Sequence, residues 1–163
     1  MKKRVKKRNN YATQQLKTTD FITTNSFRLA VYKKGSIQSD KLALVLPGRV
    51  DTKDYPHLRS HVDFLSTKGY LALSFDPPGT WESDGDISLY STTNYLKAIE
   101  KIIEYYGNKP TFVMGHSRGG TMSILAGTRL ERVERFASAM SQASFEPKII
   151  DKGWKEKGFE VFV

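Results

Sequence analysis

The sequence contains no cysteine, which excludes disulfide bonds and thiolate chemistry. It also has no apolar run that approaches the length of a membrane-spanning helix. The basic first ten residues, MKKRVKKRNN, are followed by YATQQLKTTD, where a secretory signal would need an apolar stretch. From these features we expect a cytoplasmic protein.

Histidine is scarce as well, because His57, His61 and His116 are the only three in the chain. His57 and His61 stand four residues apart in an expected helix, a spacing that can bind metals, but the sequence offers no third ligand to complete a site. Residues 115–120 lack the Lys-Ser/Thr ending of a phosphate-binding loop. We therefore predict no metal site and no cofactor.

The positive charge of the chain is concentrated at one end. The formal net charge is +9, but seven of the 26 lysines and arginines precede the first acid, Asp20, and the other 19 nearly balance the 17 acidic residues. We predict a disordered basic tail at residues 1–17 and one domain at residues 18–163. Nucleic-acid binding through the first eight residues is an alternative, although no recognised nucleic-acid motif accompanies them.

Patterns typical of strands and helices alternate through the rest of the chain. Strand patterns cover residues 17–24, 26–32, 42–46, 70–75, 111–114 and 135–140. Helix patterns cover residues 56–68, 92–106 and 118–130. We expect the first two strands to form an antiparallel hairpin and the last to be a core strand. Helices that link successive buried strands predict an α/β fold, with a mostly parallel sheet covered by helices on both faces.

A Gly-x-Ser-x-Gly pentapeptide, Gly115-His116-Ser117-Arg118-Gly119, lies between an expected buried strand and an expected helix. In this setting the pentapeptide is typical of a nucleophile elbow, a tight turn that holds the serine exposed. The flanking glycines matter because a Cβ at either position would strike the neighbouring strand or helix. Ser117 is therefore the candidate nucleophile, and Gly115, His116 and Gly119 are expected to support the elbow.

Acyl transfer at Ser117 would require backbone N–H groups that stabilise the negatively charged oxygen of the intermediate. The Arg118 amide at the start of the following helix is one candidate donor. The Arg49 amide is the other, because Arg49 belongs to the loop after the strand at 42–46. The carboxyl ends of parallel strands meet at one edge of a sheet, so this loop is expected beside the elbow.

Together these features resemble the amino-terminal two-thirds of an α/β-hydrolase. The resemblance rests on the segments LALVLPGRVD, LSFDPPGTWESDG and VMGHSRGG and covers roughly residues 18–140. It implies a three-layer fold and a serine hydrolase acting on a small acyl substrate, namely a carboxylic ester, thioester or amide. Family members continue through two more strands that precede the catalytic acid and base. We thus expect a domain truncated after its sixth strand, with residues 143–163 forming the start of a cap or a C-terminal remnant.

The resemblance places the base histidine after the serine, but no histidine follows Ser117. His57 is an alternative base because it is expected near the loop at the sheet edge. His116 is expected to point away from the Ser117 hydroxyl and to support packing. Four residues are candidate acids by position: Asp76, Asp84, Glu146 and Asp151.

We expect Asp76 to brace its own loop, and Trp81 and Trp154 to pack in the core or in loops. Without a base, we predict weak or no turnover for these 163 residues. A non-catalytic interaction protein that self-associates through an open sheet edge is the alternative.

Overall fold

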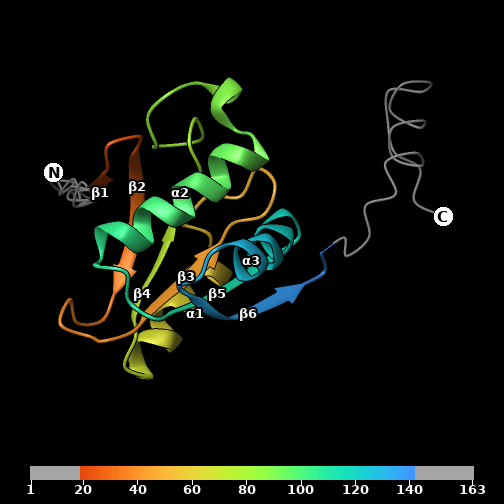
Figure 1. The fold of residues 1–163 in the computed structure, drawn as a ribbon. Helices are drawn as coiled ribbons and strands as arrows, with labels where there is room; N and C mark the ends of the chain where they lie inside the picture. Colours follow the sequence, from red (N-terminus) through yellow and green to blue (C-terminus); the bar gives the residue numbers. More distant parts are fainter. Residues whose placement is uncertain (1–18, 142–163) are drawn as a thin grey trace, which may run out of the picture.

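The computed structural model describes residues 19–141, which form a six-stranded sheet with the order β1-β2-β4-β3-β5-β6 (Figure 1). The strands are β1 (Asp20–Thr23), β2 (Arg28–Lys34), β3 (Leu42–Leu46), β4 (Leu71–Phe75), β5 (Thr111–His116) and β6 (Val133–Ala139). The helices are α1 (Pro56–Thr67), α2 (Thr92–Tyr105) and α3 (Arg118–Arg129), with a short 3-10 helix, η1 (Ile87–Leu89). None of these helices has both the length and the apolar character required to cross a bilayer. The predicted tail at 1–17 and the segment 143–163 lie outside the described residues.

The first two strands form the expected antiparallel hairpin. Phe21 of β1 faces Ala30 of β2, and the turn between the strands is closed by a 2.8 Å hydrogen bond from the Thr24 amide to the Phe27 carbonyl. β2 then pairs antiparallel with β4, whereas β4, β3, β5 and β6 run parallel to one another. The sheet is therefore mixed, as predicted, with its antiparallel strands at one side.

Helices cover both faces of the sheet, which confirms the three-layer prediction. β3 is buried on both sides, and its side chains alternate between two apolar clusters. Leu42, Leu44 and Leu46 pack with residues of α2 and α3, while Ala43 and Val45 pack with residues of α1. This division follows from the period-2 geometry of a strand. The sheet is therefore the middle layer of the domain, and β3 is a strand of that sheet covered on both faces.

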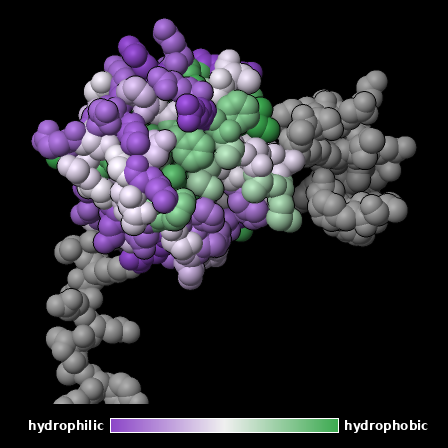
Figure 2. Space-filling view, turned by 90° about the horizontal axis from the view of Figure 1, so that it is seen from below, coloured by the Kyte–Doolittle hydropathy of each residue, from purple (hydrophilic) through white to green (hydrophobic). Residues whose placement is uncertain are grey.

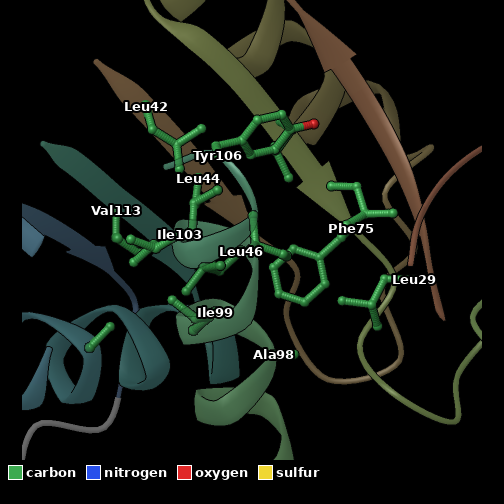
Figure 3. Packing of buried hydrophobic residues seen from close by; sticks show 14 of the residues in the cluster. Leu29, Leu42, Leu44, Leu46, Phe75, Ala98, Ile99, Ile103, Tyr106 and Val113 are labelled. Carbon is green, nitrogen blue, oxygen red and sulfur yellow. The ribbon is translucent and has the colours of Figure 1, made fainter. Parts of the chain in front are cut away.

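The larger cluster lies between the sheet and α2. Figure 3 shows Ile99 and Ile103 of α2 directed toward Leu44 and Val113 of the sheet, with Phe75 packed alongside. All five side chains are buried. The predicted apolar stripe of this helix is thereby confirmed, and its burial anchors the strands whose carboxyl ends form the candidate site.

β6 differs from the core strand predicted at 135–140. Val133 is its only buried residue, and the other six are exposed. Within the described part of the chain, β6 pairs with β5 alone and forms the edge of the sheet. Phe136 is 46% exposed for this reason, although its ring lies against Gly127 of α3. An apolar strand pattern predicts a buried strand only when a neighbour covers it on each side.

Candidate active site

Ser117 occupies the turn between β5 and α3, in a backbone conformation that serine rarely adopts. Its φ is 54° and its ψ is −122°. A positive φ in a residue other than glycine is unusual and costs on the order of 1–3 kcal/mol, so it persists only where the surroundings impose it. Here the Ser117 amide donates to the Ala139 carbonyl at 2.9 Å, and α3 begins at the next residue. The turn thus has the strained strand-to-helix geometry of a nucleophile elbow.

Both glycines of the pentapeptide are required by close packing. A Cβ on Gly115 would lie 2.3 Å from the backbone carbonyl carbon and oxygen of Gly119. A Cβ on Gly119 would lie 2.1 Å from the carbonyl oxygen of Leu46, at the end of β3. These contacts are with backbone atoms, which cannot rotate away. The tight turn at Ser117 therefore depends on the absence of side chains at both positions.

The loop after β3 lies directly beside the elbow. A Cβ on Gly48 would be 3.3 Å from the His116 carbonyl oxygen, so Gly48 and the adjoining Arg49 border the turn. On the other side, the Arg118 amide belongs to the first turn of α3, where backbone N–H groups have no acceptor within the helix. The two amides predicted as oxyanion donors consequently belong to segments that flank Ser117.

Two tyrosines fix the carbonyl groups of this loop. The Tyr95 hydroxyl donates to the Pro47 carbonyl at 3.0 Å, and the Tyr90 hydroxyl donates to the Gly48 carbonyl at 3.4 Å. Burial raises the pKa of Tyr95 well above its usual value, so its hydroxyl remains a donor. The Arg118 guanidinium lies over the Tyr90 ring, 4.4 Å from its centre. The Arg118 side chain therefore packs against this support.

Asp76, at the end of β4, joins two of the loops at the carboxyl edge. Its buried carboxylate accepts hydrogen bonds from the Thr52 hydroxyl and the Lys53 amide in one loop, and from the Glu82 amide in the other. The prediction that Asp76 braces its own loop is confirmed, and the brace extends to the loop after β3. Asp76 is committed to these contacts.

The Lys53 side chain, which is 2% exposed, completes the brace. Its ammonium group contacts Asp76 at 3.3 Å, Asp54 at 2.9 Å and also Glu82. Burial alone would lower the pKa of Lys53, but hydrogen bonds to Glu82 and Asp54 and the charge of Asp76 raise it to about 12. The hydrogen bonds from Lys53 and Thr19 in turn lower the pKa of Glu82. Lys53 thus stays charged, and the two loops are held together by an ionic cluster.

His116, His57 and Asp51 come together beside the elbow from three different segments. Their potential ligand atoms all lie within 4.8 Å of one another. His116 Nδ1 is 3.9 Å from Asp51 Oδ2, and the rings of His57 and His116 meet edge-on with their centres 6.2 Å apart. Asp51 Oδ2 also accepts the Gly48 amide at 3.0 Å. His116 therefore lies beside the loop after β3, and its role in supporting the elbow stays a prediction.

The remaining predicted residues lie away from this group or outside the described part. Asp84 forms an exposed ion pair with Arg28 at 3.0 Å. Glu146, Asp151 and Trp154 lie outside the described residues. The expected packing of Trp81 is wrong: the residue is 59% exposed and lies in a surface turn, where its φ is 49°.

Lys53 and Asp51 are the site residues that sequence reasoning missed. A lysine in a polar loop gives no signal of burial, so Lys53 could not have been found from the pattern alone. Asp51 had a weak signal, because an aspartate three residues after Gly48 is suited to accept a backbone amide in a turn. The carboxylate does so here.

The protein-family model for the alpha/beta hydrolase fold matches residues 43–157, well over half of the chain. The chain belongs to the α/β-hydrolase fold family. The match spans the loop after β3, the Asp76 loop and the elbow, so the segments described above are the ones that the family shares. A comparison with curated proteins gives no match.

Solved structures of α/β-hydrolases superpose on this chain. A thioesterase domain from the curacin biosynthetic pathway is 17% identical with a TM-score of 0.67, and the match covers 83% of this chain and 50% of that domain. An epoxide hydrolase from Vigna radiata is 21% identical with a TM-score of 0.69, and the match covers 86% of this chain and 47% of the epoxide hydrolase. The alpha/beta hydrolase domain-containing protein 10 from mouse is 21% identical with a TM-score of 0.60, and the match covers 73% of this chain and 48% of the mouse protein. The chain therefore shares their fold and spans about half of their length.

Proposed function

We propose that Ser117 is the nucleophile of a serine hydrolase that cleaves a carboxylic ester, thioester or amide through an acyl-serine intermediate. The observation that carries this proposal is the backbone of Ser117, with φ at 54° and ψ at −122° between β5 and α3. Strained backbone of this kind is found preferentially at active sites, and here it occurs at a half-buried turn between a strand and a helix. The family of the chain supports the reaction class.

In the proposed reaction, the Ser117 hydroxyl attacks the carbonyl carbon, and the leaving alcohol, thiol or amine departs with a proton. The Arg118 and Arg49 amides are the proposed donors to the tetrahedral oxyanion, because their segments flank the serine. Water then hydrolyses the acyl-serine and restores the hydroxyl. The substrate is a small acyl compound in this proposal.

The chain is proposed to be a slow catalyst by itself, because His116 is its last histidine. Within hydrolases of this kind the base takes the serine proton, and removing any member of the triad leaves about 10³–10⁴-fold catalysis over water. Substrate binding and the oxyanion donors account for the catalysis that remains. Ser117 should therefore react, but slowly.

Labelling with a fluorophosphonate probe tests this assignment. We expect slow formation of an adduct that mass spectrometry locates on Ser117, and no adduct in Ser117→Ala. Ser123→Ala is the matched control, since Ser123 is a buried serine of α3 outside the elbow. An adduct of equal yield in Ser117→Ala would refute the nucleophile, and labelling complete within seconds would refute the missing base.

A second candidate function is an interaction module with the hydrolase fold. It is favoured by β6, whose six exposed residues form a sheet edge within the described part of the chain. Figure 2 also shows an apolar area among hydrophilic side chains on one face of the molecule. This function predicts a mass above 18.5 kDa by light scattering as the concentration rises, whereas a concentration-independent monomer counts against it.

A further inference from the structure

Asp51, His57 and His116 bring two imidazoles and one carboxylate to a single point beside Ser117. They come from the loop after β3, the first turn of α1 and the end of β5, and their potential ligand atoms lie within 4.8 Å of one another. From the sequence alone we predicted no metal site, because His57 and His61 share a helix and no third ligand could be named for them. In the structure His57 is joined instead by Asp51 and His116, which come from other segments.

We propose that Asp51, His57 and His116 bind a divalent transition-metal ion, with Zn²⁺ as the representative cation. Two imidazole nitrogens and one carboxylate oxygen are a ligand set that suits zinc and its neighbours in the first transition row. Three protein ligands leave a fourth position for water or a substrate atom. That position would adjoin the elbow, because His116 immediately precedes Ser117.

One nitrogen of this group is left without a hydrogen bond in the described part of the chain. His116 Nδ1 is buried and has no hydrogen-bond partner among residues 19–141, although half-buried His116 exposes other atoms of its ring. It lies 3.9 Å from Asp51 Oδ2, which is too far for a hydrogen bond between them. A buried polar atom without a partner is costly, and a cation between these two atoms would satisfy both.

The separation of the ligand atoms requires only small side-chain movements. Around a tetrahedral zinc ion with bonds of about 2.0–2.1 Å, ligand atoms stand roughly 3.3 Å apart. The ligand atoms of the three residues now lie within 4.8 Å of one another, so each separation has to shorten by about 1.5 Å at most. His57 can supply this movement because its side chain is exposed.

Asp51 is already held in position for this role. Its Oδ2 accepts the Gly48 amide at 3.0 Å, which orients the carboxylate toward His116 while leaving further lone pairs. Hydrogen bonds that orient a metal ligand strengthen binding, and losing one typically lowers metal affinity 10–100-fold. The loop that carries the proposed oxyanion donor would thus also carry a metal ligand.

Calorimetric titration of the untagged 163-residue chain with Zn²⁺ tests the proposal. We expect one bound ion per chain, and a loss of affinity of more than about 100-fold in Asp51→Asn, His57→Gln and His116→Gln, because a direct ligand contributes more than an outer-shell partner. Ser117→Ala should bind as the unmodified chain does. The readout is therefore independent of Ser117 reactivity.

His61→Gln is the matched control, because His61 is an exposed histidine one turn further along α1. It should bind Zn²⁺ with unchanged affinity. Loss of binding in His61→Gln with retention in His116→Gln would overturn the proposal in favour of a helical histidine pair. Absence of binding to the unmodified chain, or unchanged binding in all three ligand variants, would also overturn it. Should His116→Gln fail to fold, His57→Gln decides the matter at an exposed helix position.

Discussion

At the scale of single residues, the conformation of Ser117 makes a prediction about stability. The residue has a φ of 54°, a region open to glycine but costly for serine. Ser117→Gly should remove that strain and raise the free energy of unfolding by roughly 1 kcal/mol relative to Ser117→Ala, even though glycine loses more entropy on folding. Urea unfolding of the two variants provides the measurement. A Ser117→Gly variant less stable than Ser117→Ala would show that the turn is not strained.

Gly119 gives a second prediction at the same scale. Its Cβ would lie 2.1 Å from the Leu46 carbonyl oxygen, so Gly119→Ala should cost at least about 3 kcal/mol, the upper end of typical overpacking. Gly127→Ala is the matched control in α3. Its Cβ would meet the ring of Phe136, which is half exposed and can move, and alanine favours a helix by about 1 kcal/mol. Equal losses in the two variants, measured by urea unfolding, would contradict this reasoning.

At the scale of loops, the brace of Lys53 and Asp76 makes the next prediction. Both side chains are nearly inaccessible to solvent, with 2% and 0% exposure. Lys53→Met should lower the free energy of unfolding by about 3–5 kcal/mol, because a buried carboxylate is left without its cation. Lys33→Met removes an exposed pair with Asp20 and should cost less than about 1 kcal/mol. A Lys53→Met variant as stable as Lys33→Met in chemical unfolding would refute the brace.

The same cluster gives the stability a defined dependence on pH. The pKa of Glu82 is lowered in the folded chain, so its contribution is present above the unfolded value near 4.5 and is lost as the pH falls through the folded value. The pKa of Lys53 is raised to about 12, so its contribution is complete below about 10.5 and is lost only as the pH rises through 12. Glu82→Gln should therefore reduce the loss of stability as the pH falls below 4.5, as measured by thermal unfolding. If Glu82→Gln lost stability at low pH as steeply as the unmodified chain, Glu82 would be excluded as a cause of that loss.

At the scale of the whole molecule, the sequence predicted the three layers, the hairpin and the parallel strands, because each element has strong local signals. Leu42 to Leu46 form a continuous apolar run, Pro56 begins α1, and the Ser91 hydroxyl caps α2 by accepting the Asn94 amide at 3.1 Å. The tight turn at Ser117 and its flanking glycines was predicted for the same reason. Local pattern therefore carries most of this fold.

What the sequence did not predict depends on contacts between distant segments. Lys53 is buried only because the loops after β3 and β4 fold over it. His57 and His116 meet because α1 and β5 both border the loop that contains Asp51. The exposure of β6 likewise follows from its place at the sheet edge, which its own residues do not encode. Charge clusters and edges are properties of tertiary structure, so spacing along the chain gives little sign of them.

The central proposal is that Ser117 is a hydrolase nucleophile and that the usual base is missing from these 163 residues, because no histidine follows Ser117. Imidazole added to the solution can act as an external base, so the hydrolysis of p-nitrophenyl acetate should be measured against imidazole concentration. We predict slow hydrolysis by the chain alone and an imidazole-dependent increase beyond that of Ser117→Ala, which should show only the reaction of imidazole in solution. Identical rates for the two proteins at every imidazole concentration would contradict the nucleophile, and rapid hydrolysis without imidazole would contradict the missing base.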